Sequence, residues 1–210
     1  MGMLAIADGR FREAMFWLLV TLVIDGIDGT FARLAQVGER LPHVNGKTID
    51  YVIDFFTYAI LPAYLFYEAA DMPETGRLLC AFAMLLSAAL YYGLEGMTTE
   101  DGKHFVGFPV LWNAIVYLLI FAFPDMGAGP QGLVVGIFTV LHFVPILVPY
   151  PSKGGTWWVG TLLAVVAFLT AAVMIVWQFP AVDWWWRALA AGSSLWFVVV
   201  TLVDTLRADS

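Results

Sequence analysis

The sequence has few of the residues that a soluble domain exposes to water. Only 13% of the 210 residues are charged, whereas 61% are hydrophobic. A soluble domain has about 25% charged and about 45–50% apolar residues, so this composition excludes an ordinary soluble protein and indicates a lipid bilayer. The single cysteine, Cys80, cannot form an intramolecular disulfide. The formal net charge of −7 argues against a nucleic-acid partner.

Long polar linkers are also absent from the sequence. Seven stretches are long enough to span, or nearly span, the core of a bilayer: 11–35, 46–68, 75–95, 107–123, 131–149, 156–179 and 185–206. The turns between them are short and rich in proline and glycine. Pro62 lies inside the second stretch, where its missing N–H predicts a bend after Asp54. The predicted fold is all-α, a polytopic membrane bundle of about seven transmembrane helices, with residues 1–210 forming one domain.

The basic residues predict how this bundle is oriented. One end would hold Arg33, Arg40, Lys47, Lys103, Lys153 and Arg207, and the other Arg10, Arg12, Arg77 and Arg187. Cytoplasmic loops carry an excess of lysine and arginine, so this bias of six to four places the first group in the cytoplasm.

Two pairs of aspartates lie in the first two predicted spans. Asp25 and Asp28 are three residues apart, and Asp50 and Asp54 are four apart, so each pair shares one helix face. A carboxylate at membrane depth costs about 3 kcal/mol and persists where a cation or cavity receives it. If the helices pack together, the four carboxylates converge on a site that suits Mg²⁺ or Mn²⁺ rather than zinc. A packing role, or a proton relay in a transporter, is the alternative.

Glycines and an arginine accompany the aspartates. Gly29 lies one turn after Asp25, and Gly46 lies one turn before Asp50. A glycine costs a helix interior about 1 kcal/mol, which indicates that a backbone or a flat ligand approaches closely. Arg33, on the same stripe as Asp25, adds a planar cation suited to phosphate oxygens.

Two motifs carry a resemblance to a known family. The first reads Asp25-x-x-Asp28-Gly29-x-x-Ala32-Arg33, then twelve residues, then Gly46-x-x-x-Asp50-x-x-x-Asp54. It resembles the signature of the CDP-alcohol phosphotransferases, integral membrane enzymes that move a phosphatidyl or similar group from a CDP-linked donor to an alcohol. The spacer is longer than is usual there and contains a proline, as in bacterial members that use choline. The second motif, Gly-Phe-Pro-x-x-Trp-Asn over residues 107–113, resembles the same members.

The resemblance implies a reaction and a set of residues. The chain would transfer the phosphatidyl group of CDP-diacylglycerol to choline and release CMP, in the inner membrane of a bacterium, with the site facing the cytoplasm. Asp54 would be the general base, and Mg²⁺ or Mn²⁺ would bind Asp25, Asp28, Asp50 and Asp54. The donor would bind Asp28, Gly29, Ala32, Arg33 and Gly46. Members of the family commonly form dimers, so a homodimer is expected, although no motif points to one.

Three matters stay open at this point. Aromatic faces recognise quaternary ammonium groups, and the predicted choline site comprises Tyr51, Tyr58, Phe105, Trp112 and Asn113, for each of which a packing role is the alternative. The acceptor could instead be serine or another small alcohol, and a cation or proton transporter is the alternative outside this class. The resemblance also implies one further transmembrane helix before the segment that ends in Asp25, and only the last few residues of that helix correspond to residues here, 3–7.

Overall fold

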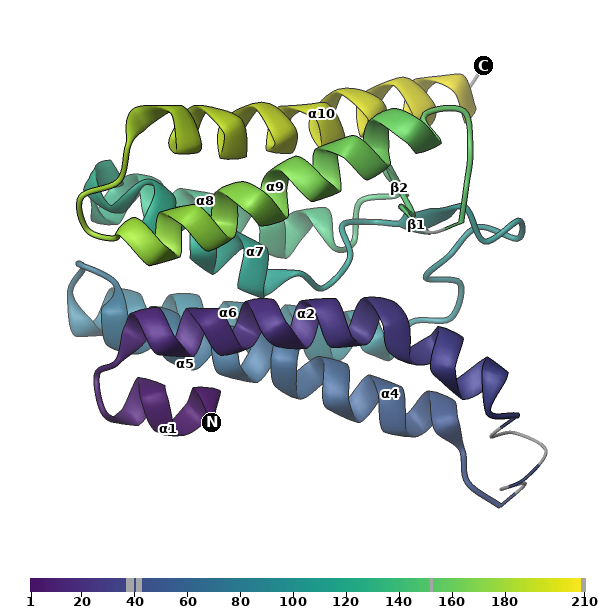
Figure 1. The fold of residues 1–210 in the computed structure, drawn as a ribbon, viewed down its shortest axis with the longest axis horizontal. Coiled ribbons are helices and arrows are strands. Elements are labelled where there is room, and N and C mark those ends of the chain that lie inside the picture. The colour runs from purple at the N-terminus through teal and green to yellow at the C-terminus, as the bar shows by residue number, and fades with distance from the viewer. Residues whose placement is uncertain (37–39, 41–42, 152, 209–210) are drawn as a thin grey trace.

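The structure, a computed structural model, is built almost entirely from helices (Figure 1). It describes residues 1–36, 40, 43–151 and 153–208, without the side chains of residues 28–30, 32 and 33. The α-helices are α1 (Gly2–Ala7), α2 (Phe11–Leu34), α4 (Gly46–Asp54), α5 (Leu61–Ala69), α6 (Glu74–Tyr92), α7 (Trp112–Tyr117), α8 (Ala128–Leu141), α9 (Trp158–Gln178) and α10 (Trp184–Ala208). Two π-helical segments, η1 (Phe55–Ile60) and η2 (Leu118–Ala122), and a 3₁₀ turn, η3 (Pro124–Met126), complete the helices. The prediction of an all-α helical membrane bundle is confirmed.

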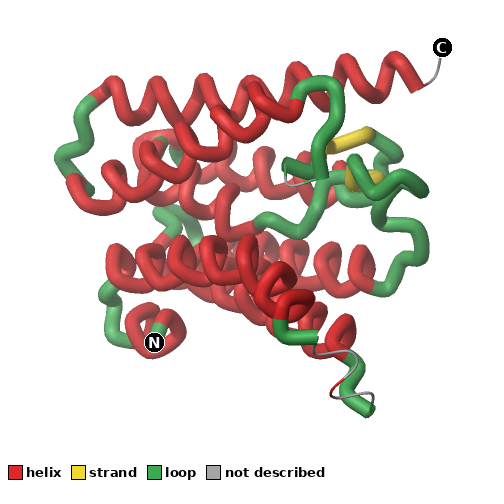
Figure 2. The backbone as a smooth tube through the Cα atoms, turned by 45° about the vertical axis from the view of Figure 1, so that its right-hand side comes forward, coloured by secondary structure: helices red, strands yellow, loops and turns green. Residues whose placement is uncertain are grey.

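Within the described residues, 4 helical segments are long and apolar enough to cross a membrane: Gly46–Ala69, Glu74–Tyr92, Trp158–Gln178 and Trp184–Ala208. Two shorter apolar helices, Trp112–Ala122 and Ala128–Leu141, lie beside them. The chain is therefore a multi-pass membrane protein. Figures 1 and 2 show α9 and α10 running side by side along one edge of the molecule, with α1, α2 and α4 at the opposite edge.

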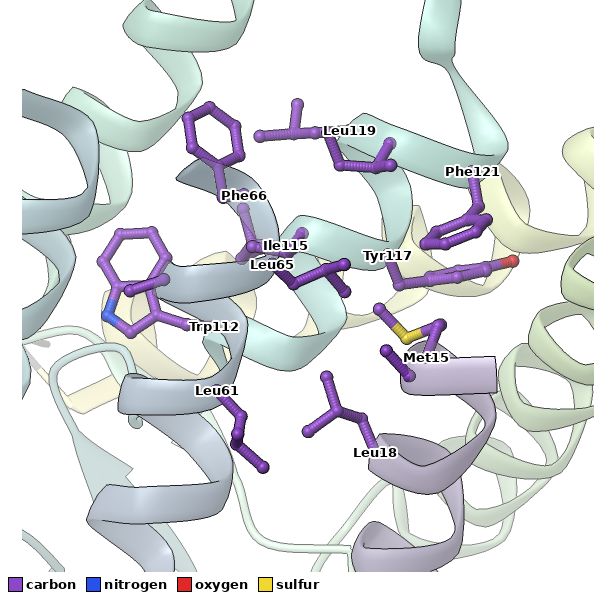
Figure 3. Packing of buried hydrophobic residues seen from close by; sticks show 14 of the residues in the cluster. Met15, Leu18, Leu61, Leu65, Phe66, Trp112, Ile115, Tyr117, Leu119 and Phe121 are labelled. Atoms are coloured by element: carbon purple, nitrogen blue, oxygen red, sulfur yellow. The ribbon is translucent and has the colours of Figure 1, made fainter. Parts of the chain in front are cut away.

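The core lies where α2, α5 and α7 meet. Figure 3 shows Met15 and Leu18 of α2 pointing toward Leu65 of α5 and Tyr117 of α7. Trp112 and Tyr117 are fully buried, and so is Leu65. Burying a large apolar side chain stabilises the fold by about 1.5–3 kcal/mol, so this junction fixes the position of α2 relative to α5.

Two predicted spans, 107–123 and 131–149, extended too far. Helix α7 begins only at Trp112, and α8 ends at Leu141. Two short antiparallel strands, β1 (His104–Val106) and β2 (Leu147–Pro149), lie beside these helix ends, with Phe105 opposite Val148. Proline at positions 109, 145 and 149 removes backbone donors, so neither helix can continue through these segments.

A π-helical segment lies next to Pro62, and the bend predicted there stays a prediction. The π-helical segment η1 directly precedes α5, in which Pro62 occupies the first turn. The hydroxyl of Thr57 donates to the carbonyl of Ile53 at 3.0 Å within this stretch. Short π-helical segments are frequent at functional sites, and this one begins immediately after Asp54.

Gly107 allows the chain to pass closely over the end of α8. Its φ is +84°, and a Cβ built there would lie 2.3 Å from the backbone oxygen of His142. The Gly107 N–H donates to the carbonyl of Ile146 at 2.9 Å. This position therefore requires glycine for both its conformation and its contact.

Gly107→Ala should lower the free energy of unfolding by about 2–5 kcal/mol, because it combines left-handed strain with overpacking. Gly102→Ala is the matched control, since Gly102 has φ +66° with nothing within 4 Å of the built Cβ, and should lose about 1–2 kcal/mol. Thermal unfolding of both variants in the same detergent measures the difference. Equal losses would show that the contact with His142 costs nothing.

The two predicted groups of basic residues fall at opposite ends of the bundle. Figure 1 shows the start of α4, the β1 and β2 strands and the C-terminus at one end. The turns between α1 and α2, α5 and α6, and α9 and α10 lie at the other end. The grouping of these segments agrees with the prediction, while the side of the membrane that each end faces stays a prediction.

Candidate metal centre

Three of the four predicted aspartates converge where α2 and α4 lie together. Asp25 from α2, and Asp50 and Asp54 from α4, each offer a carboxylate oxygen, and these oxygens lie within 4.8 Å of one another. Asp25 and Asp54 are partly buried, whereas Asp50 is exposed. We call these three residues the carboxylate cluster. Ionised carboxylates this close repel one another, so the arrangement favours a bound cation.

The remaining residues of the first motif fall mostly outside the described side chains. Helix α2 includes Asp28, Gly29, Ala32 and Arg33. The structure does not describe their side chains. Gly46 begins α4, and nothing lies within 4 Å of a Cβ built at that position. The predicted close approach at Gly46 is therefore not made by the described part of the chain, and the space beside it is open.

A side-chain cap sets the start of α4. Asn45 has an extended backbone, and its side-chain oxygen accepts a hydrogen bond from the N–H of Thr48 at 3.1 Å. Such a cap contributes about 1 kcal/mol and fixes the residue at which the helix begins. Helix α4 therefore includes both Asp50 and Asp54, which lie one turn apart on the face that meets Asp25.

Tyr58 holds one carboxylate of the cluster. Its hydroxyl donates to Oδ2 of Asp25 at 2.8 Å, and the residue is only 4% exposed. A hydrogen bond to a charged group is worth about 1.5–3 kcal/mol, so it restrains the Asp25 side chain. The structure places Tyr58, a predicted choline ligand, against Asp25 with little of its surface open.

Aromatic rings from α4, η1 and α6 lie beside the cluster. The Tyr92 ring, at the end of α6, lies 5.5 Å from that of Tyr51 and 6.3 Å from that of Phe55. Tyr51 lies three residues before Asp54, so its ring and the Asp54 carboxylate are neighbours on one side of the helix. Sequence reasoning found Tyr51 but missed the other two. Phe55 could have been found because it adjoins Asp54, whereas nothing in the sequence connects Tyr92 with the motif.

The other predicted choline ligands make different contacts. The Phe105 ring stacks on Tyr150 at 4.5 Å. Trp112 is fully buried, with its ring 5.3 Å from that of His142. Asn113 is 4% exposed, and its side-chain oxygen accepts from the N–H of Ala114 at 2.8 Å. The packing alternative therefore fits Trp112 and Asn113.

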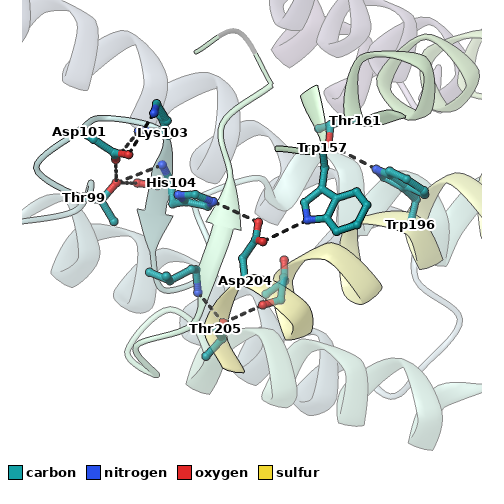
Figure 4. A network of polar contacts seen from close by, with 11 residues as sticks. Thr99, Asp101, Lys103, His104, Trp157, Thr161, Trp196, Asp204 and Thr205 are labelled. Carbon is teal, nitrogen blue, oxygen red and sulfur yellow. Dashed lines mark hydrogen bonds and ion pairs between the residues drawn. The ribbon is translucent and has the colours of Figure 1, made fainter. Parts of the chain in front are cut away.

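Another partly buried carboxylate, that of Asp204, has a structural explanation. Figure 4 shows it between His104 of β1 and Trp157, which precedes α9. Its Oδ2 lies 3.1 Å from His104 Nε2, and its Oδ1 accepts a hydrogen bond from Trp157 Nε1 at 3.1 Å. The next residue, Thr205, accepts from the N–H of Leu147 in β2 at 2.9 Å. This network attaches the two strands to α10 at the end of the molecule where α4 begins.

The loop before β1 contributes a further restraint to this network. The Thr99 hydroxyl donates to Asp101 at 2.7 Å and the Lys103 N–H donates to it at 3.1 Å. These two bonds hold the pKa of the Asp101 carboxyl below its ordinary value. The two hydrogen bonds orient the Asp101 carboxylate within the turn that leads into β1.

The fold and the site define a class: a multi-pass helical membrane protein with a carboxylate cluster where two of its helices meet. No protein-family model matches the chain. The phosphatidylcholine synthase of Rhizobium meliloti (strain 1021) is 39% identical over 153 residues, which are 73% of this chain and 62% of that protein. The phosphatidylcholine synthase of Agrobacterium fabrum is 37% identical over 73% of this chain and 62% of that protein. The phosphatidylcholine synthase of Borreliella burgdorferi is 32% identical over 72% of this chain and 64% of that protein.

The chain is a homologue of the bacterial phosphatidylcholine synthases. This relationship confirms the resemblance that the two motifs predicted. The matched region spans less than two thirds of the length of these relatives.

Proposed function

We propose that the chain transfers the phosphatidyl group of CDP-diacylglycerol to choline, which gives phosphatidylcholine and CMP. The convergence of Asp25, Asp50 and Asp54 within 4.8 Å carries this proposal, because transfer at a diphosphate needs a site for divalent metal. Similarity to phosphatidylcholine synthases supports choline as the acceptor. The proposed location is a bacterial inner membrane, with the site facing the cytoplasm, and the proposed assembly is a homodimer.

The carboxylate cluster fits Mg²⁺ or Mn²⁺. It offers three carboxylate ligands with no cysteine or histidine among them, which is the donor set that these ions prefer. Asp25, Asp50 and Asp54 would hold the ion, with Asp28 as the proposed fourth ligand. When bound, a divalent ion would offset the charge of the diphosphate and of the departing CMP.

The residues of the chain then have separate roles. As the choline oxygen bonds to the phosphatidyl phosphorus and the bond from phosphorus to CMP breaks, Asp54 accepts the hydroxyl proton. Tyr58 restrains Asp25 through the bond at 2.8 Å. On the donor side, Asp28, Gly29, Ala32, Arg33 and Gly46 would bind the CDP group. The open space at Gly46 supports this arrangement.

The decisive experiment is an acceptor screen with the purified full chain in lipid nanodiscs. CDP-diacylglycerol is supplied with choline, serine, glycerol phosphate or inositol phosphate, with Mg²⁺, Mn²⁺ or EDTA, and CMP release is measured. Choline-dependent release that EDTA abolishes supports the proposal. Release with serine alone would favour a phosphatidylserine synthase. No release with any acceptor, together with ion flux in proteoliposomes, would favour the transporter.

The proposed orientation predicts which side of the membrane the site faces. In a Cys80→Ala background, a cysteine introduced by Val44→Cys, one residue before the α4 cap, should react with an impermeant maleimide only from the cytoplasmic side. Val44 is 45% exposed, and replacing it leaves Asn45 and its cap intact. Asp71→Cys, in the exposed turn between α5 and α6, is the control and should be labelled only from outside. The reverse pattern would place the site on the outer face.

A further inference from the structure

Three aromatic residues surround one side of the carboxylate cluster. We call Tyr51, Phe55 and Tyr92 the aromatic cluster. The Tyr92 ring contacts both others, tilted by 42° to Tyr51 and edge-on to Phe55. All three residues are partly buried, so their rings are neither sealed in the core nor fully in solvent.

The aromatic cluster lies next to the reacting groups through the chain itself. Tyr51 lies three residues before Asp54 and four before Phe55, so these side chains are neighbours on one side of the helix. Tyr92 comes from a different helix, α6, and its ring lies 5.5 Å from the ring of Tyr51 and 6.3 Å from that of Phe55. A ligand that places a hydroxyl at Asp54 therefore has aromatic rings within reach of its other end.

One ring of the cluster already receives a cation. The ammonium of Lys47 lies 5.4 Å from the centre of the Tyr51 ring, inside the range of cation–π attraction. The nearby carboxylates add a negative potential. The rings thus present electron-rich faces beside an acidic site, a combination that favours a positively charged group.

The other predicted aromatic ligands do not offer such a face. Tyr58 is 4% exposed and its hydroxyl is bonded to Asp25. Trp112 is fully buried against His142. Phe105 is covered by the ring of Tyr150, which itself lies under the ammonium of Lys153.

We propose that the aromatic cluster binds the trimethylammonium group of the acceptor alcohol, and that Tyr92 is its specificity-determining residue. The inference rests on the proposed function and replaces Trp112 and Phe105 by Tyr92 and Phe55 as ligands. Tyr92 has this role because it brings a ring from α6 to the two rings that α4 and η1 supply. The packing of α6 on η1 therefore brings the third ring to the acceptor site.

The test compares choline with 3,3-dimethylbutan-1-ol, which has the same shape without the charge. In Tyr92→Leu, the KM for choline should rise about tenfold, which corresponds to the loss of one cation–π contact. The KM for CDP-diacylglycerol should stay within about twofold. The preference of the enzyme for choline over the neutral alcohol should fall by about the same tenfold. Tyr92→Phe keeps the ring and should retain the preference.

Tyr150→Leu is the matched control, because Tyr150 also has a lysine ammonium, that of Lys153, 5.6 Å from its ring. Its choline preference should be unchanged. An unchanged preference for choline in Tyr92→Leu, including the case in which activity falls equally with both alcohols, would overturn the inference. If Tyr92→Leu does not fold, Tyr51→Leu is judged by the same criterion. A wild-type chain without choline-dependent CMP release would instead overturn the proposed function.

Discussion

Asp25→Asn or Asp50→Asn should reduce phosphatidyl transfer by at least about 10² to 10³, the loss expected when one preorganised electrostatic contact is removed. Each change replaces a charged metal ligand by a neutral amide while nearly preserving its size. Both variants should also lose stabilisation by Mn²⁺, which for the wild-type chain amounts to about 2.7 kcal/mol at 100 times the dissociation constant. CMP release and thermal unfolding, each with and without Mn²⁺, measure the two effects.

Without metal, Asp25→Asn and Asp50→Asn should be more stable than the wild-type chain. Three carboxylates within 4.8 Å repel one another, so removing one charge should stabilise the chain in EDTA relative to wild type. Asp71→Asn, in an exposed turn at the far end of the bundle, is the control and should alter neither property. Near-normal activity in Asp25→Asn or Asp50→Asn would rule out the proposed metal site.

The convergence of the aspartates could be predicted because two strong constraints act on them. A carboxylate is costly in a bilayer, and helical spacing places Asp50 and Asp54 on one face. Neither constraint depends on the rest of the fold. Packing α2 against α4 is then the arrangement in which Asp25 joins them, and the structure has this arrangement.

The residues that sequence reasoning missed are those that only tertiary packing brings to the site. Tyr92 ends a helix far along the chain, and its place beside Tyr51 depends on how α6 packs on η1. Local patterns carry no information about such a contact. Phe55 was overlooked because 16% of the sequence is aromatic, so one more ring in an apolar span has no distinguishing signal.

The second motif also has a packing role that its sequence did not reveal. Gly107, Phe108 and Trp112 all contact His142: the glycine through its backbone, and the two rings at 5.8 and 5.3 Å from the imidazole. His142 is 1% exposed. These residues join the end of α8 to the start of α7, so close packing explains the motif without contact with choline.

Asp54→Asn should separate chemistry from binding. The substitution keeps the size of the side chain and one oxygen but removes the charge that accepts a proton. A positioned general base contributes about 10² to 10⁴ in rate, so choline-dependent CMP release should fall by that factor. The affinity for CDP-diacylglycerol should change little, because Asp25, Asp50 and the donor-side residues remain.

Asp25→Asn is the comparison that gives this result its meaning. Asp25 belongs to the same cluster and is restrained by Tyr58, but no proton transfer is assigned to it. It should therefore lose donor affinity as well as rate. The measurements are CDP-diacylglycerol binding in the presence of Mn²⁺ and single-turnover CMP release for both variants. Equal loss of donor binding in the two would make Asp54 simply another metal ligand, and the base would have to be sought elsewhere.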